Sequence, residues 1–318
     1  MVNISKLTFD IPNEFDIFHR SINKIKSIKI STTKRLVIID GSSLLFRAYY
    51  AVPQILSNYS EPVGAIYGFI QSLKFILRKV LLKTQQAFLT IALDVGGGQN
   101  FRYEIYKSYK QNRRAAPVDL IFQLQLVRTM LDSFGIKYVY DQYSEADDVI
   151  GAYAKHGVEN GYEVVVVSGD KDLMQLISDK IMFYDIIKKR FCTVKDVYEK
   201  FGVMPNQICD YLAIVGDKSD NIPGIRGIGN KIAADLLKTF NTLDGIYSNI
   251  DKIPQLRIRD ILQNGYESAY LSKRLVVLKQ DVDLQYGLDD MEWNGFKANA
   301  LKISDFLARY ALDSLINF

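Results

Sequence analysis

The sequence predicts an α/β protein with a doubly wound, mostly parallel β-sheet, followed by a helical region. Three apolar runs carry this prediction, because each leads to an aspartate: residues 36–39 before Asp40, 87–93 before Asp94, and 164–167 before Asp170. Such β-branched runs are typical of buried parallel strands. Ligands bind beyond the carboxyl ends of parallel strands, so we expect these acids to meet at one edge of the sheet.

Strands and helices alternate along the first half of the chain. The expected strands lie at 36–39, 88–93, 136–140, 164–167 and 181–184, and the expected helices at 64–82, at 118–134, from Ser144 and, briefly, from Lys171. This alternation predicts the doubly wound sheet. Beyond Arg190 the strand signals fade and prolines punctuate helices. We therefore expect an extension at 1–34, an α/β core at 35–190 and a helical subdomain at 191–318.

Composition narrows the possible chemistry. The chain has 318 residues, of which 48% are hydrophobic, and this is enough for a sizeable core. A formal net charge of +4 does not by itself indicate nucleic-acid binding. Cys192 and Cys209 lie far apart without a Cys-x-x-Cys pattern, which argues against a structural zinc site or a disulfide framework and fits a reducing compartment. His19 and His156 are the only histidines, so few residues could act as the base that activates a serine or cysteine nucleophile.

No apolar run is long enough to cross a membrane, and the N-terminus lacks the apolar core of a secretory signal. We therefore expect a cytoplasmic protein that neither spans a membrane nor is exported by that route. Residues 1–34 are rich in Lys and Arg but also carry Asp10, Glu14 and Asp16. A loosely ordered extension is expected there, and an organellar presequence is the alternative.

Gathering several carboxylates at one edge requires a counter-charge. Two unit charges about 5 Å apart repel by roughly 3 kcal/mol at an effective dielectric near 20. Oxygen ligands without thiolate or imidazole suit Mg²⁺ or Mn²⁺. For single acids, helix capping is the alternative: Ser144 would be an N-cap, and Asp170 or Asp172 could cap the next helix. Capping does not explain why so many acids fall at strand ends.

A second acidic cluster, at 216–221, directly precedes a glycine-rich turn. Gly224, Gly227 and Gly229 lead into an apolar helix that begins at Lys231. Such a turn presents backbone amides at a helix N-terminus and can hold a phosphate backbone without reading bases. The alternative is a plain connection between two helices.

Residues 101–114 interleave cations with aromatic side chains. This pattern is expected for a surface that neutralises phosphates and offers rings for stacking, and a solvated helix is the alternative. Because the segment follows Asp94, it would overhang the acidic edge.

Taken in order, these motifs resemble the signatures of the 5′-nuclease domain of bacterial DNA polymerase I, within the flap-endonuclease superfamily. The motifs are Asp40–Ser43, Phe101-Arg102 to Tyr109-Lys110 to Arg113, Glu145–Asp148, Gly169–Asp172 and Gly216–Gly224. The resemblance runs from about residue 35 to the C-terminus. It implies a PIN-like α/β core, a helical arch at about 96–117, and a helix-hairpin-helix element at about 216–240 that binds duplex DNA, often around a K⁺ ion.

The resemblance also implies roles for individual residues. Two or more Mg²⁺ ions, replaceable by Mn²⁺, would be held by two sets of acids: Asp40, Asp94, Glu145 and Asp147 around the first ion, and Asp170, Asp172 and Asp220 around the second. Asp148 and Asp217 would be outer or bridging acids of this metal site. The arch cations Arg102, Lys110 and Arg113 would contact the substrate phosphate. Further DNA contacts would come from Phe46, Arg47, Tyr109, Gly224, Gly227, Gly229 and Lys231. Phe46 stands where the family commonly has a Tyr that stacks on a terminal base.

The implied activity is that of a metal-dependent 5′ to 3′ exonuclease and structure-specific 5′-flap endonuclease. It would act, as a monomer, on DNA and on RNA primers in RNA/DNA hybrids during replication and repair. The alternatives are an RNA-directed PIN-type nuclease or other phosphohydrolase, and a catalytically silent DNA-binding module. Gly96–Gly98 and Arg114–Pro117 depart from the family pattern, which leaves the shape of the arch open. A stand-alone enzyme and an excised polymerase domain both remain possible.

Overall fold

The computed structural model describes residues 34–82, 84–95 and 100–316. The expected N-terminal extension, except for Lys34, lies outside the described residues, as do Gly96–Gly98 at the start of the expected arch. Among the residues that are described, none of the helices has the length and apolar character needed to cross a bilayer.

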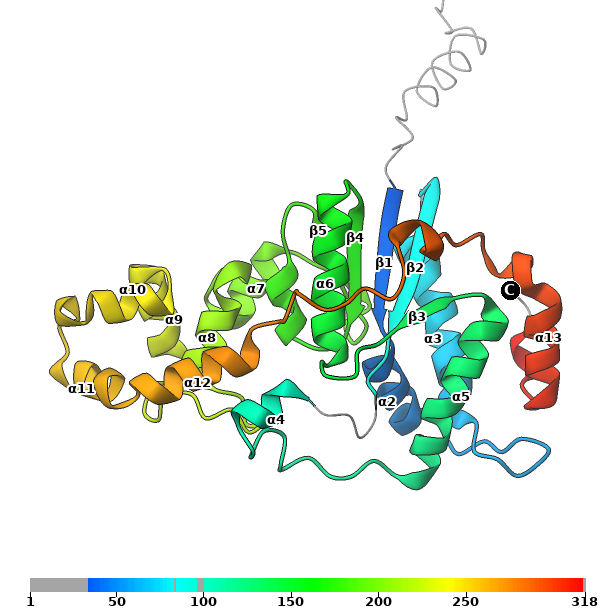
Figure 1. Ribbon diagram of the computed structural model, residues 1–318, viewed down its shortest axis with the longest axis horizontal. Helices are drawn as coiled ribbons and strands as arrows, with labels where there is room; N and C mark the ends of the chain where they lie inside the picture. Colours follow the sequence, from blue (N-terminus) through cyan, green and yellow to red (C-terminus); the bar gives the residue numbers. More distant parts are fainter. Residues whose placement is uncertain (1–33, 83, 96–99, 317–318) are drawn as a thin grey trace, which may run out of the picture. The chain divides into compact units, whose positions relative to one another are not determined.

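A six-stranded sheet lies at the centre of the described chain, in the order β3-β2-β1-β4-β5-β6 (Figure 1). The strands are β1 (Lys34–Asp40), β2 (Gln86–Ala92), β3 (Lys137–Val139), β4 (Glu163–Ser168), β5 (Ile181–Asp185) and β6 (Arg190–Cys192). β1 to β5 pair in parallel, and β6 pairs antiparallel with β5. The expected mostly parallel sheet is confirmed, with β6 as an additional short edge strand.

Helices cover both faces of the sheet because the side chains of a strand alternate between them. In β1, Val37 and Ile39 belong to the core that includes residues of α3 (Gly64–Val80) and α5 (Val118–Phe134). Leu36 and Ile38 belong to the opposite core, with residues of α6 (Ala146–Glu159). All four side chains are fully buried. This two-sided burial explains why the strand is an unbroken apolar run.

Helices dominate the chain after β6. They are α7 (Val194–Phe201), α8 (Ile208–Val215), α9 (Asn230–Phe240), α10 (Leu243–Ser248), α11 (Leu256–Asn264), α12 (Tyr266–Val276) and α13 (Ala300–Arg309), with short 3₁₀ turns between some of them. α8 packs against α9 and α12, whereas α13 returns to pack against α5. The division at residue 190 stays a prediction. The remaining helices, α2 (Gly41–Ala51) and α4 (Phe101–Ile105), lie at the carboxyl end of the sheet (Figure 1).

Candidate active site

The register of the parallel strands brings the predicted acids to one edge. Asp40, the last residue of β1, is level with Ala92 of β2, so Asp94 follows two residues later. Ile39 is level with Val167 of β4, and Asp170 follows shortly beyond that strand. The carboxyl ends of the three strands therefore present their aspartates together, as the sequence predicts.

A cavity of about 240 Å³ opens at this edge. The acids that line it are Asp40, Asp94, Glu145, Asp147, Asp170 and Asp220, and the other lining residues are Ser42, Ser43, Phe46, Lys110, Arg113 and Ala146. These acids come from separate stretches of the chain. Capping of single helices cannot account for their shared position, so the cavity is the candidate active site.

Neighbouring backbone and hydroxyl groups fix the acids at the strand ends. One carboxylate oxygen of Asp40 accepts the Ser43 N–H at 2.9 Å and so caps α2, while the other accepts the Ser168 hydroxyl at 2.6 Å. Asp94 accepts the Ala146 N–H at 2.8 Å. These bonds orient both carboxylates before any ligand arrives. Ser168 was not predicted as part of the site, although it follows directly on the apolar run of β4.

The start of α6 differs from the expectation. Glu145, not Ser144, is the N-cap, and it forms a capping box with Asp148. The Ser144 hydroxyl is buried without a hydrogen-bond partner. Within the first turn, Asp147 lines the cavity while Asp148 is directed elsewhere.

Asp148 and Arg102 form a buried ion pair instead of lining the cavity. Asp148 is 0% exposed and Arg102 is 2% exposed, and the guanidinium donates two hydrogen bonds to the carboxylate, at 2.6 and 2.8 Å. Arg102 also donates to the Leu275 carbonyl at 2.7 Å. A buried charge needs such partners. The expected phosphate contact of Arg102 is therefore corrected: the pair joins α4 to α6 and to the end of α12. Asp148 lies outside the cavity lining, and its role as an outer acid of the metal site stays a prediction.

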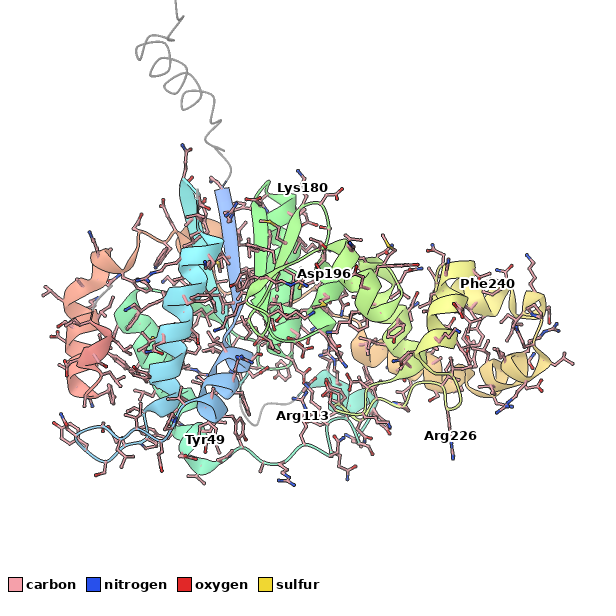
Figure 2. The ribbon with its side chains drawn as sticks, turned by 180° about the vertical axis from the view of Figure 1, so that it is seen from behind. Tyr49, Arg113, Lys180, Asp196, Arg226 and Phe240 are labelled. Carbon is pink, nitrogen blue, oxygen red and sulfur yellow. The ribbon has the colours of Figure 1, made fainter. Side chains whose placement is uncertain are left out.

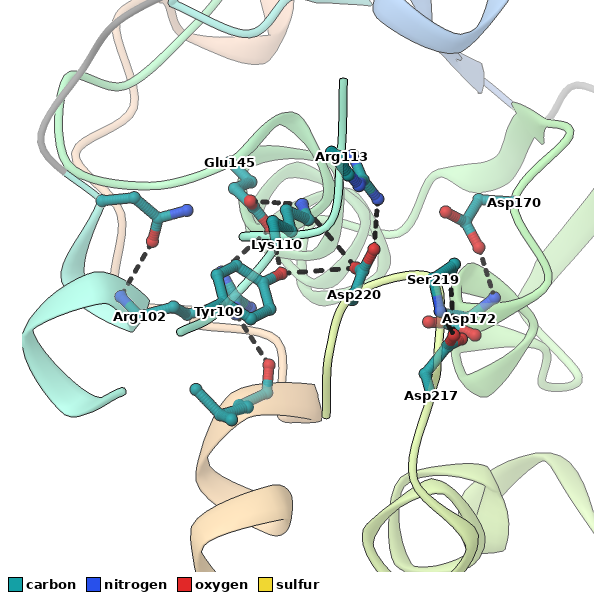
Figure 3. A network of polar contacts seen from close by, with 12 residues as sticks. Arg102, Tyr109, Lys110, Arg113, Glu145, Asp170, Asp172, Asp217, Ser219 and Asp220 are labelled. Atoms are coloured by element: carbon teal, nitrogen blue, oxygen red, sulfur yellow. Dashed lines mark hydrogen bonds and ion pairs between the residues drawn. The ribbon is translucent and has the colours of Figure 1, made fainter. Parts of the chain in front are cut away.

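Two other arch cations do lie over the acids, as Figure 3 shows. The Lys110 ammonium pairs with Glu145 and lies 3.8 Å from Oδ2 of Asp220, and Arg113 pairs with Asp220. Lys110 has a backbone φ of 53°, in the left-handed region that a lysine seldom adopts. Its N–H donates to the Asp220 carbonyl at 2.9 Å, which holds the segment in this conformation.

Tyr109 does not present its ring for stacking. It is 2% exposed, and its hydroxyl donates to Oε2 of Glu145 at 3.0 Å. The expected contact of Tyr109 with DNA is corrected on this ground. Its position supports Glu145 instead.

The acids that follow β4 and α8 form the other half of the cluster. Asp170 accepts the Asp172 N–H at 2.9 Å, and Asp217 accepts the Lys171 ammonium at 2.8 Å and the Ser219 hydroxyl at 2.6 Å. Oδ1 of Asp172 is buried with no hydrogen-bond partner. A buried carboxylate oxygen without a donor is costly, and a bound cation would relieve that cost.

Electrostatics divide the acids into two groups. Burial, together with the charges of Asp94 and Asp170, raises the pKa of Asp40 to about 7, although hydrogen bonds from Ser168 and Ser43 oppose the rise. Burial and the charge of Asp170 likewise raise the pKa of Asp172 to about 7. The pKa of Asp147 is raised well above its usual value by burial and the surrounding acids. Negative charge around these three is therefore poorly compensated.

The remaining acids have cations beside them. Burial raises the pKa of Glu145, but Lys110 and Arg102 outweigh it, so the net pKa is lowered. In the same way, burial is outweighed at Asp217, whose pKa is lowered by hydrogen bonds from Lys171 and Ser219. These lysines already neutralise part of the cluster.

The donor set fits a hard divalent cation such as Mg²⁺. It consists of carboxylate oxygens, it includes the unpartnered oxygen of Asp172, and its raised pKa values indicate excess negative charge. Among the described residues, no group of three acidic, histidine or cysteine side chains is already arranged around one metal position. Binding would therefore draw the carboxylates closer together.

The glycine-rich turn before α9 is presented in part to solvent. Gly229 caps α9 without a side-chain hydrogen bond, and it is exposed, as are Gly227 and Lys231. Arg226, which the sequence analysis did not single out, is also exposed and projects from the turn (Figure 2). Arg226 could have been predicted from the sequence, because it is a basic residue next to the glycines of this turn.

Gly224 has a packing role instead of the expected contact with DNA. It is buried, with a φ of 62°, and a Cβ there would lie 2.4 Å from the Gly216 nitrogen. Its N–H donates to the Ser272 hydroxyl at 2.9 Å. The assignment of Gly224 to the DNA surface is therefore corrected: it lets the turn pack closely against the end of α8 and α12.

Phe46 and Arg47, the two residues of α2 that were predicted to contact DNA, lie on different sides of that helix. Phe46 is 40% exposed and lines the cavity, as expected for a residue at its rim. Arg47 is exposed and lines a second pocket, bounded by α2 and α3.

Comparison with known proteins agrees with this geometry. Residues 35–202 match the model of the N-terminal resolvase-like domain of 5′-3′ exonucleases, and residues 203–299 match that of their C-terminal SAM fold. A 5′-3′ exonuclease of Buchnera aphidicola is 37% identical over 286 residues, which cover 88% of this chain and 98% of that protein. DNA polymerase I of Caldicellulosiruptor bescii is 37% identical over 298 residues, covering 89% of this chain. The chain spans only 34% of that polymerase.

Solved structures share the fold. A 5′-exonuclease of bacteriophage T5 with bound zinc superposes with a TM-score of 0.61 at 22% identity, over 89% of this chain and 97% of that one. A flap endonuclease of the same phage, in complex with DNA and metal ions, has a TM-score of 0.61 at 20% identity, over 89% of this chain and 96% of that one. The matched domains, taken together with the full-length exonuclease relative, show that the chain belongs to the 5′-3′ exonuclease family.

Proposed function

We propose that the chain hydrolyses phosphodiester bonds in DNA, as a divalent-metal-dependent 5′ to 3′ exonuclease and structure-specific 5′-flap endonuclease. The observation that carries this proposal is the carboxylate-lined cavity overhung by Lys110 and Arg113. The relative from Buchnera, which bears the name 5′-3′ exonuclease and aligns over 98% of its length, supports it.

The proposed cofactor is Mg²⁺, with Mn²⁺ as a substitute. Asp40, Asp94, Glu145 and Asp147 would hold one ion, and Asp170, Asp172 and Asp220 a second, with Asp217 as an outer acid. When bound, such ions activate an attacking water and neutralise the leaving oxygen. Zinc and other metal ions in the phage structures support a metal site in this fold.

The cations over the cavity would act on the phosphate. Lys110 and Arg113 now neutralise Glu145 and Asp220. A phosphodiester that enters the cavity offers these cations a second anion, so they would hold the phosphate where negative charge develops during the reaction. Phe46, at the rim, would offer its ring to a terminal base.

A second region would hold the duplex. The exposed residues Gly227 and Gly229, together with the exposed side chains of Arg226 and Lys231, form a surface suited to phosphates. We propose that this element binds duplex DNA, with K⁺ as a further ligand. We also propose that the chain acts as a cytoplasmic monomer, and that it cleaves RNA/DNA hybrids as well as DNA.

A cleavage assay on three substrates tests the proposal. A 5′-labelled flap duplex, a blunt duplex and a single-stranded RNA are incubated with Mg²⁺ or with EDTA. We expect cleavage near the flap junction that requires Mg²⁺ and that exceeds cleavage of the RNA. Preferred cleavage of the RNA, or binding of the flap without cleavage, would favour the two alternative functions instead.

A further inference from the structure

A second pocket lies on the other side of α2 from the acidic cavity. It measures about 330 Å³, and Leu44, Arg47, Phe75, Tyr184 and Lys189 are among its lining residues. Residues 44, 47 and 51 of α2 all line it, which is the spacing of one helix face. Phe46 of the same helix lines the acidic cavity. The two sites are therefore separated only by the width of α2.

The second pocket is basic and partly aromatic. Arg47 and Lys189 are both exposed, and no acidic side chain of the described chain lines the pocket. The Lys189 ammonium lies 5.4 Å from the centre of the Phe75 ring, and the Lys79 ammonium lies 5.7 Å from it. A pocket with cations beside an exposed ring suits a nucleotide, whose phosphate and base have complementary chemistry.

Lys189 is held in the pocket by a strained turn. Between β5 and β6, Oδ1 of Asp185 accepts the N–H groups of Ile187 at 2.8 Å and Lys188 at 2.9 Å. Lys189 follows with a φ of 54°. A left-handed conformation is unfavourable for a lysine, whereas Gly or Asn adopts it more readily. A strained residue that places a cation in a pocket is a reason to look for a ligand.

Tyr184 gives an independent observation. It is 2% exposed and lines the pocket, and its hydroxyl is buried without a hydrogen-bond partner. A buried hydroxyl without a hydrogen-bond partner destabilises the folded protein. An acceptor oxygen on a ligand in the pocket could receive this hydrogen bond, as a phosphate oxygen would.

We propose that this pocket binds one nucleotide of the substrate strand, through its phosphate, while the same strand is held at the acidic cavity. The proposal rests on the proposed nuclease function. An α-helix with its side chains is about 10–12 Å wide, and phosphates of one strand are spaced about 3.4 Å along a duplex axis. The bound phosphate therefore lies within a few nucleotides of the scissile one on the same strand.

The first test compares two lysines near the ends of β5. Lys189→Asn removes the cation from the pocket and places a residue that tolerates the left-handed turn, so the variant should melt no lower than the wild type. Lys180→Asn removes one charge at the opposite end of the sheet from α2 (Figure 2). Binding of a fluorescent 5′-flap duplex is measured in EDTA over a series of salt concentrations. We expect Lys189→Asn alone to reduce the slope of log K against log [salt] by about 1.

A second test identifies which phosphate of the substrate binds in the second pocket. Single phosphates of each strand are replaced by neutral methylphosphonates, and binding is measured for the wild type and for Lys189→Asn. We expect a neutral linkage at one position, within a few nucleotides of the cleavage point on the cut strand, to weaken wild-type binding but to have no further effect in the variant. The proposal is overturned by the absence of such coupling at every position, by coupling on the other strand, or by an equal change in slope for Lys180→Asn.

The outcome for the pocket is separable from that for the nuclease function. If the wild type cleaves the flap with Mg²⁺ but shows no coupling, the pocket proposal fails and the nuclease function stands. If the wild type does not cleave the flap at all, the nuclease function fails, and with it the role of this pocket in holding a cut strand.

Discussion

At the scale of single residues, Asp147 and Asp148 are neighbours in one helical turn but have different roles. One lines the candidate active site, and the other forms a buried ion pair. Successive residues of an α-helix point about 100° apart. Asp147 therefore lines the acidic cavity, while Asp148 is fully buried and bound by Arg102. The first carries uncompensated charge, and the second is neutralised.

Replacement of Asp147 by Asn should separate stability from activity. The pKa of Asp147 is raised by burial and by neighbouring acids, so its charge destabilises the metal-free protein. We expect Asp147→Asn to raise the free energy of unfolding in EDTA, because the neutral amide removes a charge that burial and the surrounding acids disfavour. Urea denaturation measures this change. Flap cleavage with Mg²⁺ should be lost, and the exposed Asp281→Asn should alter neither quantity.

The stability of the metal-free protein should fall as pH rises from about 4 to 7. In the folded state the pKa values of Asp40 and Asp172 are about 7, above the usual value of 3.8. The folded state therefore binds more protons than the unfolded state in this window, and raising the pH favours unfolding. Glu145 and Asp217 have lowered pKa values, so their contributions change only at lower pH. Melting in EDTA between pH 5 and 8 measures the trend, and a melting temperature that rises up to pH 7 would contradict it.

Lys110 should contribute to turnover more than to folding. Asn tolerates the left-handed backbone at this position, where φ is 53°, so Lys110→Asn should fold. Loss of one preorganised cation should lower single-turnover cleavage by about 10²–10³-fold. Lys107→Asn, an exposed change in the same segment, is the matched control. Equal cleavage rates for the two variants would show that Lys110 does not contribute to the reaction.

At the scale of elements, the side chain of Arg102 ties the short helix α4 to two other helices. Arg102 donates to Asp148 of α6 and to the carbonyls of Leu275 and Val277, at and just beyond the end of α12. The position of the arch relative to the cavity thus depends on a buried ion pair.

Breaking this pair should be strongly destabilising. Arg102→Met leaves Asp148 buried and without its guanidinium, a loss that costs about 3–5 kcal/mol. Arg114→Met replaces an exposed arginine nearby and should change the free energy of unfolding by less than about 0.5 kcal/mol. Both are measured by urea denaturation. Similar values for the two variants would show that the buried pair does not anchor α4.

Elements with a strong local pattern were predictable from the sequence, and others were not. β1, β2 and β4 are long apolar runs, and their positions were confirmed. α2 was missed because Asp40, interpreted as a metal ligand, is also its N-cap, and the following Gly and Ser residues favour a helix only weakly. The three-residue strand β6 is too short to show an alternating pattern.

At the scale of the whole molecule, the meeting of Asp40, Asp94 and Asp170 was predictable because it follows from the topology of the sheet. Parallel strands place their carboxyl ends at one edge, so aspartates at strand ends must meet there. The burial of Tyr109, Arg102 and Gly224 could not be predicted in this way. Their surroundings are built by α4, α8 and α12, which are distant in sequence and carry no local signal of their mutual contacts.

The central claim is that acids from separate segments bind divalent ions together. Calorimetric titration of Mn²⁺ at about pH 8, into the wild type and into Asp170→Asn, tests it most directly. Asp170 lines the cavity and raises the pKa values of both Asp40 and Asp172, so it lies within reach of both proposed ions. The wild type should bind Mn²⁺, and the variant should lose at least one ion. Identical binding by the two proteins, or no binding by the wild type, would contradict the account.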